Sequence, residues 1–418
     1  MKILLIGNGP LKQVGSGMQN AYSIRTQMYF DYLKKQNFNF RTILLSEVTS
    51  YKNFNILETN LKGRSLKNFI QKEINNQKPD VIISVNNLTS YIVSKLKFTS
   101  YFIADLNGFL LGEVQLQNFY LKHDNYLQTY IQREKQIIQK ADKLVSCSLN
   151  QKKALVGELA LMGKLNSQNF GKNLISNVAN YCEAKMVEDT LDLKLPKNAI
   201  TIGWLSGFNN WVDEKTLFEI LKNTMQNNPN LYFVCTGGKY KDMPNGKFEY
   251  IYKNLKKAKL LERCRFLNFV DNRYLQSVIN CFDIAINTDL DCIESNFGAR
   301  NRITELLANK IPVITTDNSE ISSVVSLYNL GLSFGNSEKQ DAIDYLNNYS
   351  KEVAKKLSKN FKRYFKENTL EIIMQEIGTY LKAPFKAMNT KKKNSVFLAI
   401  SYLKEKGIKQ FFKRLFNY

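Results

Sequence analysis

A chain of 418 residues, 44% of them hydrophobic, is long enough to bury the cores of two or three domains, which excludes an intrinsically disordered protein. The formal net charge of +22, from 59 Lys and Arg against 37 Asp and Glu, predicts an anionic partner such as nucleotide phosphates, nucleic acid or an acidic lipid surface. The basic residues show no zinc-finger spacing and no RNA-binding aromatic motif, so we do not expect nucleic acid as the partner.

The six cysteines are scattered, without the paired spacing of a metal site. We expect them to be reduced thiols within the protein. The N-terminal sequence MKILLIG lacks the apolar segment and cleavage site of a signal peptide, and no segment approaches the roughly 20 apolar residues that span a membrane. These features predict a cytoplasmic protein, or one that binds peripherally to the inner face of the cytoplasmic membrane.

Short apolar segments alternate with helical patterns in the first half of the chain, as in a parallel sheet that is covered by helices on both faces. The predicted strands are residues 2–7, 40–46, 80–85, 100–106 and 142–148. This alternation stops at about residue 178. We therefore predict a first Rossmann-like domain of residues 1–180, followed by a linker of residues 181–198.

The same alternation starts again after the linker. The predicted strands are residues 199–207, 231–238, 264–270, 283–289 and 311–317, and residues 338–382 are helical by pattern. The fold class is therefore α/β, with two doubly wound parallel-sheet domains, the second of residues 199–384. Ligands of such sheets bind beyond the carboxyl ends of the strands, so we expect two facing domains to enclose one cleft.

Two loops of the first domain are candidates for this cleft. The first carries Gly15 and Gly17, and it does not match the GxGxxG fingerprint of dinucleotide binding. The second carries Asp105 and Asn107 after a predicted strand, which favours contact with an acceptor. The alternative is a structural Asp105, because Asp-Leu-Asn-Gly is also a good turn sequence.

The most informative segment is Ile293–Ser322, which we interpret as a loop, a helix that opens at Gly298, and a strand. Arg300 and Arg302 lie in the first turn of this helix, where the helix dipole disfavours cations. A diphosphate bound at the helix N-terminus explains their presence. Glu305 follows Arg302 by one turn, so an ordinary i,i+3 salt bridge is the alternative.

This segment resembles the donor-binding segment of the family 4 (group 1) GT-B glycosyltransferases. The matching residues are Glu294, Gly298, Arg300, Asn301, Arg302, Glu305 and Pro312 to Thr316. Residues 206–218, 104–115 and 148–166 resemble other motifs of the same subset, so the resemblance covers roughly residues 1 to 380. In the wider family two glutamates are separated by seven residues, whereas ten separate Glu294 from Glu305 here.

The resemblance implies an enzyme that transfers a sugar from a nucleotide diphosphate donor with retention of anomeric configuration. Glu294 is then expected to orient sugar hydroxyls, and Glu305 the ribose or the sugar. The implied donor site comprises Gly15, Gly17, Gly207, Asn209, Gly237, Gly298, Arg300, Arg302 and Glu305, and the catalytic set comprises Asp105, Glu294, Arg300 and Arg302. Neither a cofactor nor a metal is expected, although Asp289-Leu290-Asp291 spells the metal-binding DxD of another glycosyltransferase fold.

Common family members place an Arg and a Lys in the first loop of the donor domain, where this chain has Phe208 and Val212. Neutralisation of the donor phosphates is then expected to depend more heavily on Arg300 and Arg302.

Residues 385–418 form a basic tail, in which apolar residues recur from Val396 to Leu415 at near-helical spacing. This pattern is typical of an amphipathic helix in an anionic membrane interface, where each Lys or Arg contributes about 1 kcal/mol. The alternatives are a helix that packs on the domains and a helix that binds a protein partner.

The leading hypothesis is transfer of a sugar to a glycan or lipid-linked acceptor in the assembly of surface polysaccharide, lipopolysaccharide or glycolipid. Two alternatives stay open. A nucleotide-sugar epimerase on the same frame would act on the donor alone. A non-catalytic, membrane-associated glycan-binding scaffold would turn over no donor.

Overall fold

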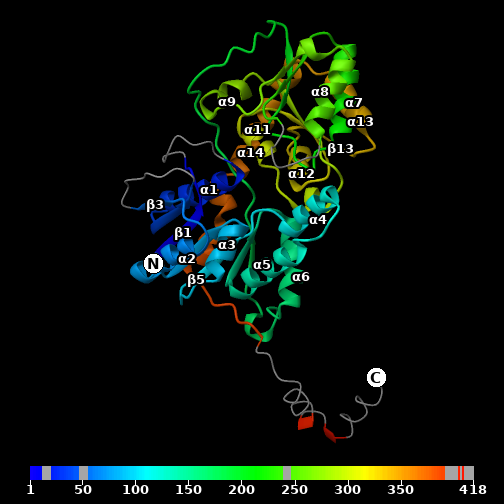
Figure 1. Ribbon diagram of the computed structural model, residues 1–418. Helices are drawn as coiled ribbons and strands as arrows, with labels where there is room; N and C mark the ends of the chain where they lie inside the picture. Colours follow the sequence, from blue (N-terminus) through cyan, green and yellow to red (C-terminus); the bar gives the residue numbers. More distant parts are fainter. Residues whose placement is uncertain (12–19, 47–54, 239–245, 391–402, 405–406, 409–418) are drawn as a thin grey trace.

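The computed structural model describes residues 1–11, 20–46, 55–238, 246–390, 403–404 and 407–408. Two α/β domains lie one above the other (Figure 1). The glycines predicted for the first loop, Gly15 and Gly17, lie outside the described residues. Most of the predicted tail helix does so too, and it stays a prediction.

The first domain is a parallel sheet of seven strands with helices on both sides. Its strands are β1 (Lys2–Asn8), β2 (Asn39–Leu45), β3 (Ile56–Thr59), β4 (Val81–Val85), β5 (Tyr101–Asp105), β6 (Lys143–Ser146) and β7 (Ile175–Asn177). Its helices are α1 (Ala21–Lys35), α2 (Gly63–Gln77), α3 (Asn87–Ser94), α4 (Leu110–Leu121), α5 (Leu127–Lys140) and α6 (Leu149–Leu161), with a short 3₁₀ turn at Ser167–Asn169.

The second domain contains a parallel sheet of six strands. Its strands are β8 (Ile200–Trp204), β9 (Leu231–Cys235), β10 (Cys264–Phe266), β11 (Ile284–Asn287), β12 (Val313–Thr316) and β13 (Gly331–Phe334). Its helices are α7 (Glu214–Asn227), α8 (Lys247–Lys257), α9 (Asn272–Ile279), α10 (Ile293–Phe297), α11 (Asn301–Ala308), α12 (Glu320–Leu327), α13 (Lys339–Asn347) and α14 (Lys351–Glu367), with a 3₁₀ turn at Leu261–Arg263.

The strand order of both sheets reverses once, which makes both domains doubly wound. The first sheet runs β3-β2-β1-β4-β5-β6-β7 and the second β10-β9-β8-β11-β12-β13. The chain turns back between β1 and β4 in the first domain and between β8 and β11 in the second. Ligands of open parallel sheets bind at such switch points, beyond the carboxyl ends of the strands.

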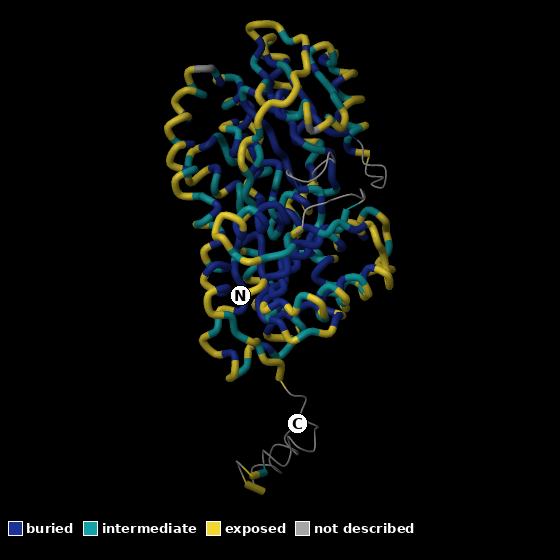
Figure 2. Tube along the Cα trace, turned by 90° about the vertical axis from the view of Figure 1, so that its left-hand side faces the viewer, coloured by how far each residue is buried: buried dark blue, intermediate teal, exposed yellow. Residues whose placement is uncertain are grey.

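Burial on both faces of each sheet explains the continuous apolar segments of the sequence. All five residues of β4, Val81–Val85, are buried, as are all four of β12. Buried residues run through the middle of both domains, and exposed residues lie on the outer helices and loops (Figure 2). The domain cores are thus sandwiched between helix layers, as the alternating pattern predicts.

The last helices of the predicted second domain pack against the first domain. Helices α15 (Leu370–Ile373) and α16 (Gln375–Lys382) return to the first domain, where Met374, Ile377 and Leu381 join the core around β1 and α1. A side chain at Gly378 would collide with the Tyr32 hydroxyl, so this glycine allows α16 to approach α1. The apolar face of these helices thus completes the first core, whereas the sequence assigns residues up to 384 to the second domain.

Two global properties bear on the environment of the protein. All six cysteines are described and none forms a disulfide; Cys147, Cys235 and Cys264 are buried. None of the helices in the described ranges is long and apolar enough to cross a bilayer.

Candidate functional site

The loops after β8 and β9 meet closely at the switch point of the second domain. Ser206 has a positive φ of 87°, and a side chain at Gly237 would lie 2.4 Å from the Ser206 carbonyl carbon and 2.6 Å from the Gly207 nitrogen. Only glycine therefore fits at position 237, where φ is +90°. Gly207, Asn209 and Gly237, which the sequence predicts as donor-binding, thus lie in one compact loop region, and Asn209 is buried.

A buried ion cluster occupies the neighbouring position, beyond the end of β11. Arg300 donates from Nε to Asp289 Oδ2 at 2.6 Å, from Nη1 to Glu294 Oε1 at 3.1 Å and from Nη2 to Glu294 Oε2 at 2.8 Å. All three side chains are at most 4% exposed. The two carboxylates raise the pKa of Arg300 above its ordinary value, although burial alone would lower it. Arg300 therefore holds Glu294 in a fixed orientation.

The contacts of Arg300 differ from the predicted ones. The sequence predicts contact with a diphosphate, whereas the guanidinium is paired with two acids inside the second domain. Its partner Asp289 begins the DxD sequence, and Asp291 accepts a hydrogen bond from Asn296 at 3.0 Å. Within the described residues, no cluster of three or more metal-ligating side chains is present.

Gly298 also has a different role from the predicted one. The segment before it, Ile293–Phe297, is the short helix α10 rather than a loop, and α11 begins at Asn301, not at Gly298. A side chain at Gly298 would lie 2.9 Å from both Arg300 Nη1 and Glu294 Oε1. The absence of a side chain at this position leaves room for the Arg300–Glu294 pair.

Two other cations lie near the carboxyl ends of β8 and β9. Arg302 lies over the Trp204 ring, with its guanidinium carbon 5.2 Å from the ring centre, and it is 8% exposed. Lys247, at the start of α8, donates to the Val212 carbonyl at 2.5 Å and pairs with Glu214 at 2.8 Å. Lys247 was not predicted from the sequence, because it begins an ordinary amphipathic helix.

The apolar residues that replace the family's basic pair are part of the core. Phe208 stacks on Trp204 with ring centres 4.9 Å apart, and Val212 is completely buried. Lys247 donates to the backbone of Val212. It therefore brings a positive charge to the loop in which common family members have an Arg and a Lys.

The first domain contacts α10 directly, so Glu294 lies at the interface between the domains. Ser148 donates to the Phe297 carbonyl at 2.6 Å, and Asn150 donates to the Asn296 carbonyl at 3.0 Å. The Phe109 and Phe297 rings lie 5.2 Å apart. These contacts come from the starts of α4 and α6, at the carboxyl edge of the first sheet.

Glu113 on α4 lies near Glu294 and was not predicted from the sequence. A side chain at Gly112 would lie 3.3 Å from the Cα and nitrogen of Glu294, so the two backbones are close. Burial, followed by the nearby Glu294 carboxylate, raises the pKa of Glu113 to about 8, and Arg300 opposes this shift. An acid from each domain therefore lies at the contact between the domains. The raised pKa favours the protonated form of Glu113 at neutral pH.

Asp105 does not face the cleft as an acceptor ligand. It is fully buried, and its Oδ2 accepts from Arg25 Nε at 3.0 Å and from the Tyr29 hydroxyl at 2.6 Å. Its Oδ1 accepts from the Asn107 backbone at 2.9 Å. The structural alternative is thus the better description, because Asp105 neutralises the buried Arg25.

Asparagines occupy the carboxyl ends of the central strands instead. Asn107 donates to the Asn86 side chain at 3.1 Å, and Asn86 donates to the Asn8 side chain at 3.1 Å. Asn86 has φ 78° and ψ 153°, a conformation that non-glycine residues rarely adopt. Strained residues of this kind cluster at functional sites, which supports Asn107 as a cleft residue.

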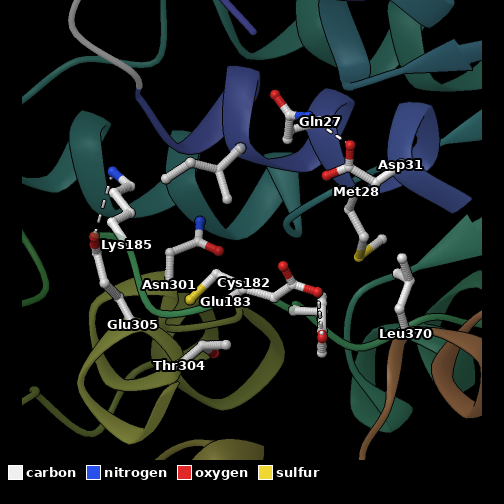
Figure 3. Close-up of a pocket in the computed structure, with 12 residues that line it drawn as sticks. Gln27, Met28, Asp31, Cys182, Glu183, Lys185, Asn301, Thr304, Glu305 and Leu370 are labelled. Carbon is white, nitrogen blue, oxygen red and sulfur yellow. Dashed lines mark hydrogen bonds and ion pairs between the residues drawn. The ribbon is translucent and has the colours of Figure 1, made fainter. Parts of the chain in front are cut away.

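Glu305 lies in a pocket between the two domains and the linker (Figure 3). Its carboxylate is 3.8 Å from the ammonium group of Lys185, and the same pocket is lined by Met28 of α1 and by Asn301 and Thr304 of α11. The structure therefore places Glu305 beside the linker, whereas Glu294 contacts α4 of the facing domain.

The sequence of the second domain matches a known family. Residues 192–368 match the family model described as Glycosyl transferases group 1. The second domain is therefore similar to the group 1 glycosyltransferases. No curated protein is similar in sequence to this chain at a significant level.

Solved structures of glycosyltransferases have the same two-domain fold as this chain. HepE from Anabaena, in complex with UDP and glucose, is 14% identical over 92% of this chain and 100% of that chain, with a TM-score of 0.64. Sucrose-phosphate synthase from Thermosynechococcus elongatus is 14% identical over 91% and 98%, with a TM-score of 0.67. The lipopolysaccharide outer core galactosyltransferase WaaB is 15% identical over 92% and 100%, with a TM-score of 0.56. The fold of this chain is therefore GT-B, as the motifs predict.

Proposed function

We propose that this protein is a glycosyltransferase that transfers a sugar from a UDP-linked donor to a glycan or lipid-linked acceptor, with retention of configuration. The observation that carries the proposal is the orientation of Glu294, which Arg300 holds through two hydrogen bonds where α10 meets the first domain. Two findings support the proposal. Residues 192–368 match the group 1 family. HepE, which has a similar fold, was solved in complex with UDP and glucose and in complex with UDP-glucose.

Glu294 is suited to bind the donor sugar. A carboxylate accepts hydrogen bonds from sugar hydroxyls, and a fixed carboxylate loses little conformational entropy when it does so. The second carboxyl group, on Glu113, is protonated at neutral pH and can donate to the same ligand from the opposite domain. The donor sugar then lies between α4 and α10.

The departing diphosphate needs positive charge, because negative charge grows on it in the oxocarbenium-like transition state. Arg302 and Lys247 supply this charge in our proposal. Arg302 lies over Trp204 at the end of β8. Lys247 contacts the carbonyl of Val212, in the loop that follows β8. Arg300 has a positioning role through Glu294. This division differs from the sequence-based expectation, in which Arg300 and Arg302 share the phosphates.

The acceptor side is formed by the first domain, with Asn107 as the residue that we expect to contact it. The expected acceptors are glycans or lipid-linked glycans of the cell envelope, and the expected place of action is the inner face of the cytoplasmic membrane. The net charge of +22 and the basic tail sequence support this place. No metal or cofactor has a role in this proposal.

The test is release of nucleotide from a panel of UDP-, GDP-, dTDP- and CMP-sugars, with and without lipid-linked glycan acceptors. We expect turnover with UDP-sugars, and NMR of the product should show the anomeric configuration of the donor. Glu294→Gln should lower turnover at least tenfold, since hydrogen bonds to charged groups contribute about 1.5–3 kcal/mol. Glu262→Gln, an exposed acid of the same domain, is the control. Absence of turnover with every donor would favour the scaffold, and turnover that converts the donor sugar without an acceptor would favour the epimerase.

A further inference from the structure

Trp211 lies in the loop between β8 and α7, beside the ion cluster of the second domain. Its backbone carbonyl accepts from the Leu290 nitrogen at 2.7 Å. The guanidinium carbon of Arg300 lies 5.1 Å from the centre of the Trp211 ring. Contacts of both the backbone and the side chain thus hold Trp211 next to the arginine that orients Glu294.

The indole N–H of Trp211 has no acceptor within the described part of the chain. Its Nε1 atom is buried, although the residue as a whole is only partly buried. An indole N–H can only donate, and a buried donor without a partner costs free energy. The other tryptophan, Trp204, shows the ordinary arrangement, because its Nε1 donates to the Ser206 carbonyl at 2.9 Å. The N–H of Trp211 is therefore available to a bound ligand.

The first domain approaches this loop across the cleft. The Tyr120 hydroxyl on α4 donates to the carbonyl of Asn210 at 3.4 Å. Glu113 lies about two turns earlier on α4, and hence on the same face of the helix. This face of α4 therefore covers both Glu294 and the loop that carries Trp211. A sugar bound between α4 and α10 lies beside that loop.

Arg300 brings two complementary hydrogen-bonding groups together. Its Nη atoms hold the Glu294 carboxylate, and its guanidinium lies over the Trp211 ring. A carboxylate only accepts hydrogen bonds, whereas an indole N–H only donates them. A hydroxyl can do both, so neighbouring hydroxyls of one sugar can satisfy the two groups at once.

We propose that the Trp211 N–H donates to a hydroxyl oxygen of the donor sugar and so determines which sugars the protein accepts. The inference rests on the proposed function, because that function places a nucleotide-linked sugar beside Glu294. A site with a buried N–H rejects a sugar that lacks the matching oxygen, since the N–H then remains unpaired. Trp211 is thus a specificity-determining residue.

The test compares the wild type with Trp211→Phe, which removes the N–H and keeps an aromatic ring beside Arg300. Calorimetric titration measures the binding of UDP, UDP-glucose, UDP-galactose and UDP-N-acetylglucosamine. It then measures single-deoxy analogues of the UDP-sugar that the wild type binds most tightly. The matched control is Trp204→Phe, which removes an N–H that is already paired within the protein. Thermal melting shows whether each variant is folded.

We expect Trp211→Phe to bind UDP as tightly as the wild type does. It should bind the preferred UDP-sugar roughly three- to tenfold more weakly, the equivalent of one neutral hydrogen bond. One deoxy analogue should lose much less affinity in Trp211→Phe than in the wild type, because the variant has no N–H for the missing hydroxyl. Trp204→Phe should instead melt at a lower temperature and change the affinity for UDP and for every UDP-sugar by the same factor.

NMR of the wild type gives a second measurement, which does not depend on the folding of Trp211→Phe. Isotope-labelled tryptophan gives only two indole N–H signals, and either single variant assigns them. The Trp211 signal should shift when the preferred UDP-sugar replaces UDP in the site, whereas the Trp204 signal should not. A Trp211 signal that is the same with UDP and with the UDP-sugar would contradict the proposed contact.

Two calorimetric results would overturn the inference and leave the proposed function intact. The first is the same loss for every deoxy analogue in the wild type and in folded Trp211→Phe. The second is an equal loss for UDP and for UDP-sugars in Trp211→Phe, which would assign the N–H to the nucleotide. Absence of wild-type binding to every UDP-sugar would contradict the proposed function itself, and the inference would fail with it.

Discussion

Arg300 donates two hydrogen bonds to the carboxylate of Glu294, at 3.1 and 2.8 Å, while its Nε donates to Asp289 at 2.6 Å. The pair joins the start of α11 to α10, and α10 is the segment that the first domain contacts. The orientation of Glu294 therefore depends on the ion cluster of the second domain and on the position of the first. Gly298 leaves the space in which this cluster forms.

Replacement of Arg300 should affect stability as well as activity. Arg300→Met leaves Asp289 and Glu294 buried without their cation, so we expect a loss of about 3–5 kcal/mol in the free energy of unfolding. Urea unfolding measures this loss, and Arg363→Met, which removes an exposed i,i+4 pair, is the control. An Arg300→Met variant of wild-type stability that has lost donor binding would show instead that Arg300 serves the diphosphate.

Gly298 should not tolerate even a methyl group. Gly298→Ala places a carbon 2.7 Å from the Glu294 carbonyl oxygen and 2.9 Å from Arg300 Nη1, so the pair must separate at a cost of about 1–3 kcal/mol. Donor turnover should fall in proportion to the displacement of Glu294. Gly157→Ala is the matched control, because a side chain there meets no atom within 4 Å. Unchanged turnover in Gly298→Ala would contradict the assigned role of this glycine.

The pKa of Glu113 predicts a dependence on pH. Because folding raises this pKa from 4.5 to about 8, the folded state binds the proton more tightly, and stability falls as the pH rises through this range. Glu113→Gln removes the ionisation, so its melting temperature should exceed that of the wild type by an amount that grows between pH 5 and about 8. We also expect wild-type donor binding to weaken as the pH rises and Glu113 ionises. The Glu113→Gln variant should not show this decline. A melting difference that is independent of pH would contradict the raised pKa.

Substitutions of Asp105 and Asn107 should distinguish a structural role from a role in acceptor binding. Asp105→Asn leaves the buried Arg25 without its counter-ion, so we expect a loss of about 3–5 kcal/mol in stability. Asn107→Ala should leave the fold intact and raise the KM for the acceptor several-fold, with little change in the KM for the donor. If Asp105→Asn is as stable as the wild type and has a raised acceptor KM, the catalytic role expected from the sequence would be restored.

Much of the fold was predictable because buried strands appear as continuous apolar segments. The ten predicted strands correspond to β1, β2, β4, β5, β6 and to β8 through β12. The missed strands β3, β7 and β13 have only three or four residues, and they lie at the edges of the sheets, so they carry little apolar signal. The return of α15 and α16 was also missed, since their apolar face does not indicate which core it completes.

The site was only partly predictable, because the sequence shows which groups are present and not which groups neutralise one another. Arg300 and Glu294 stand out in the sequence, yet their pairing also needs Asp289 and the space at Gly298. Glu113 lies more than 180 residues before Glu294, and only the stacking of the domains makes them neighbours.

The most direct measurement is a calorimetric titration of UDP and UDP-glucose into the wild type and Glu294→Gln. If Glu294 contacts the donor sugar, the variant should bind UDP-glucose about tenfold or more weakly, since hydrogen bonds to charged groups contribute about 1.5–3 kcal/mol, and it should bind UDP with unchanged affinity. Equal losses for both ligands would place Glu294 away from the sugar. Absence of wild-type binding to either ligand would contradict the UDP-sugar donor itself.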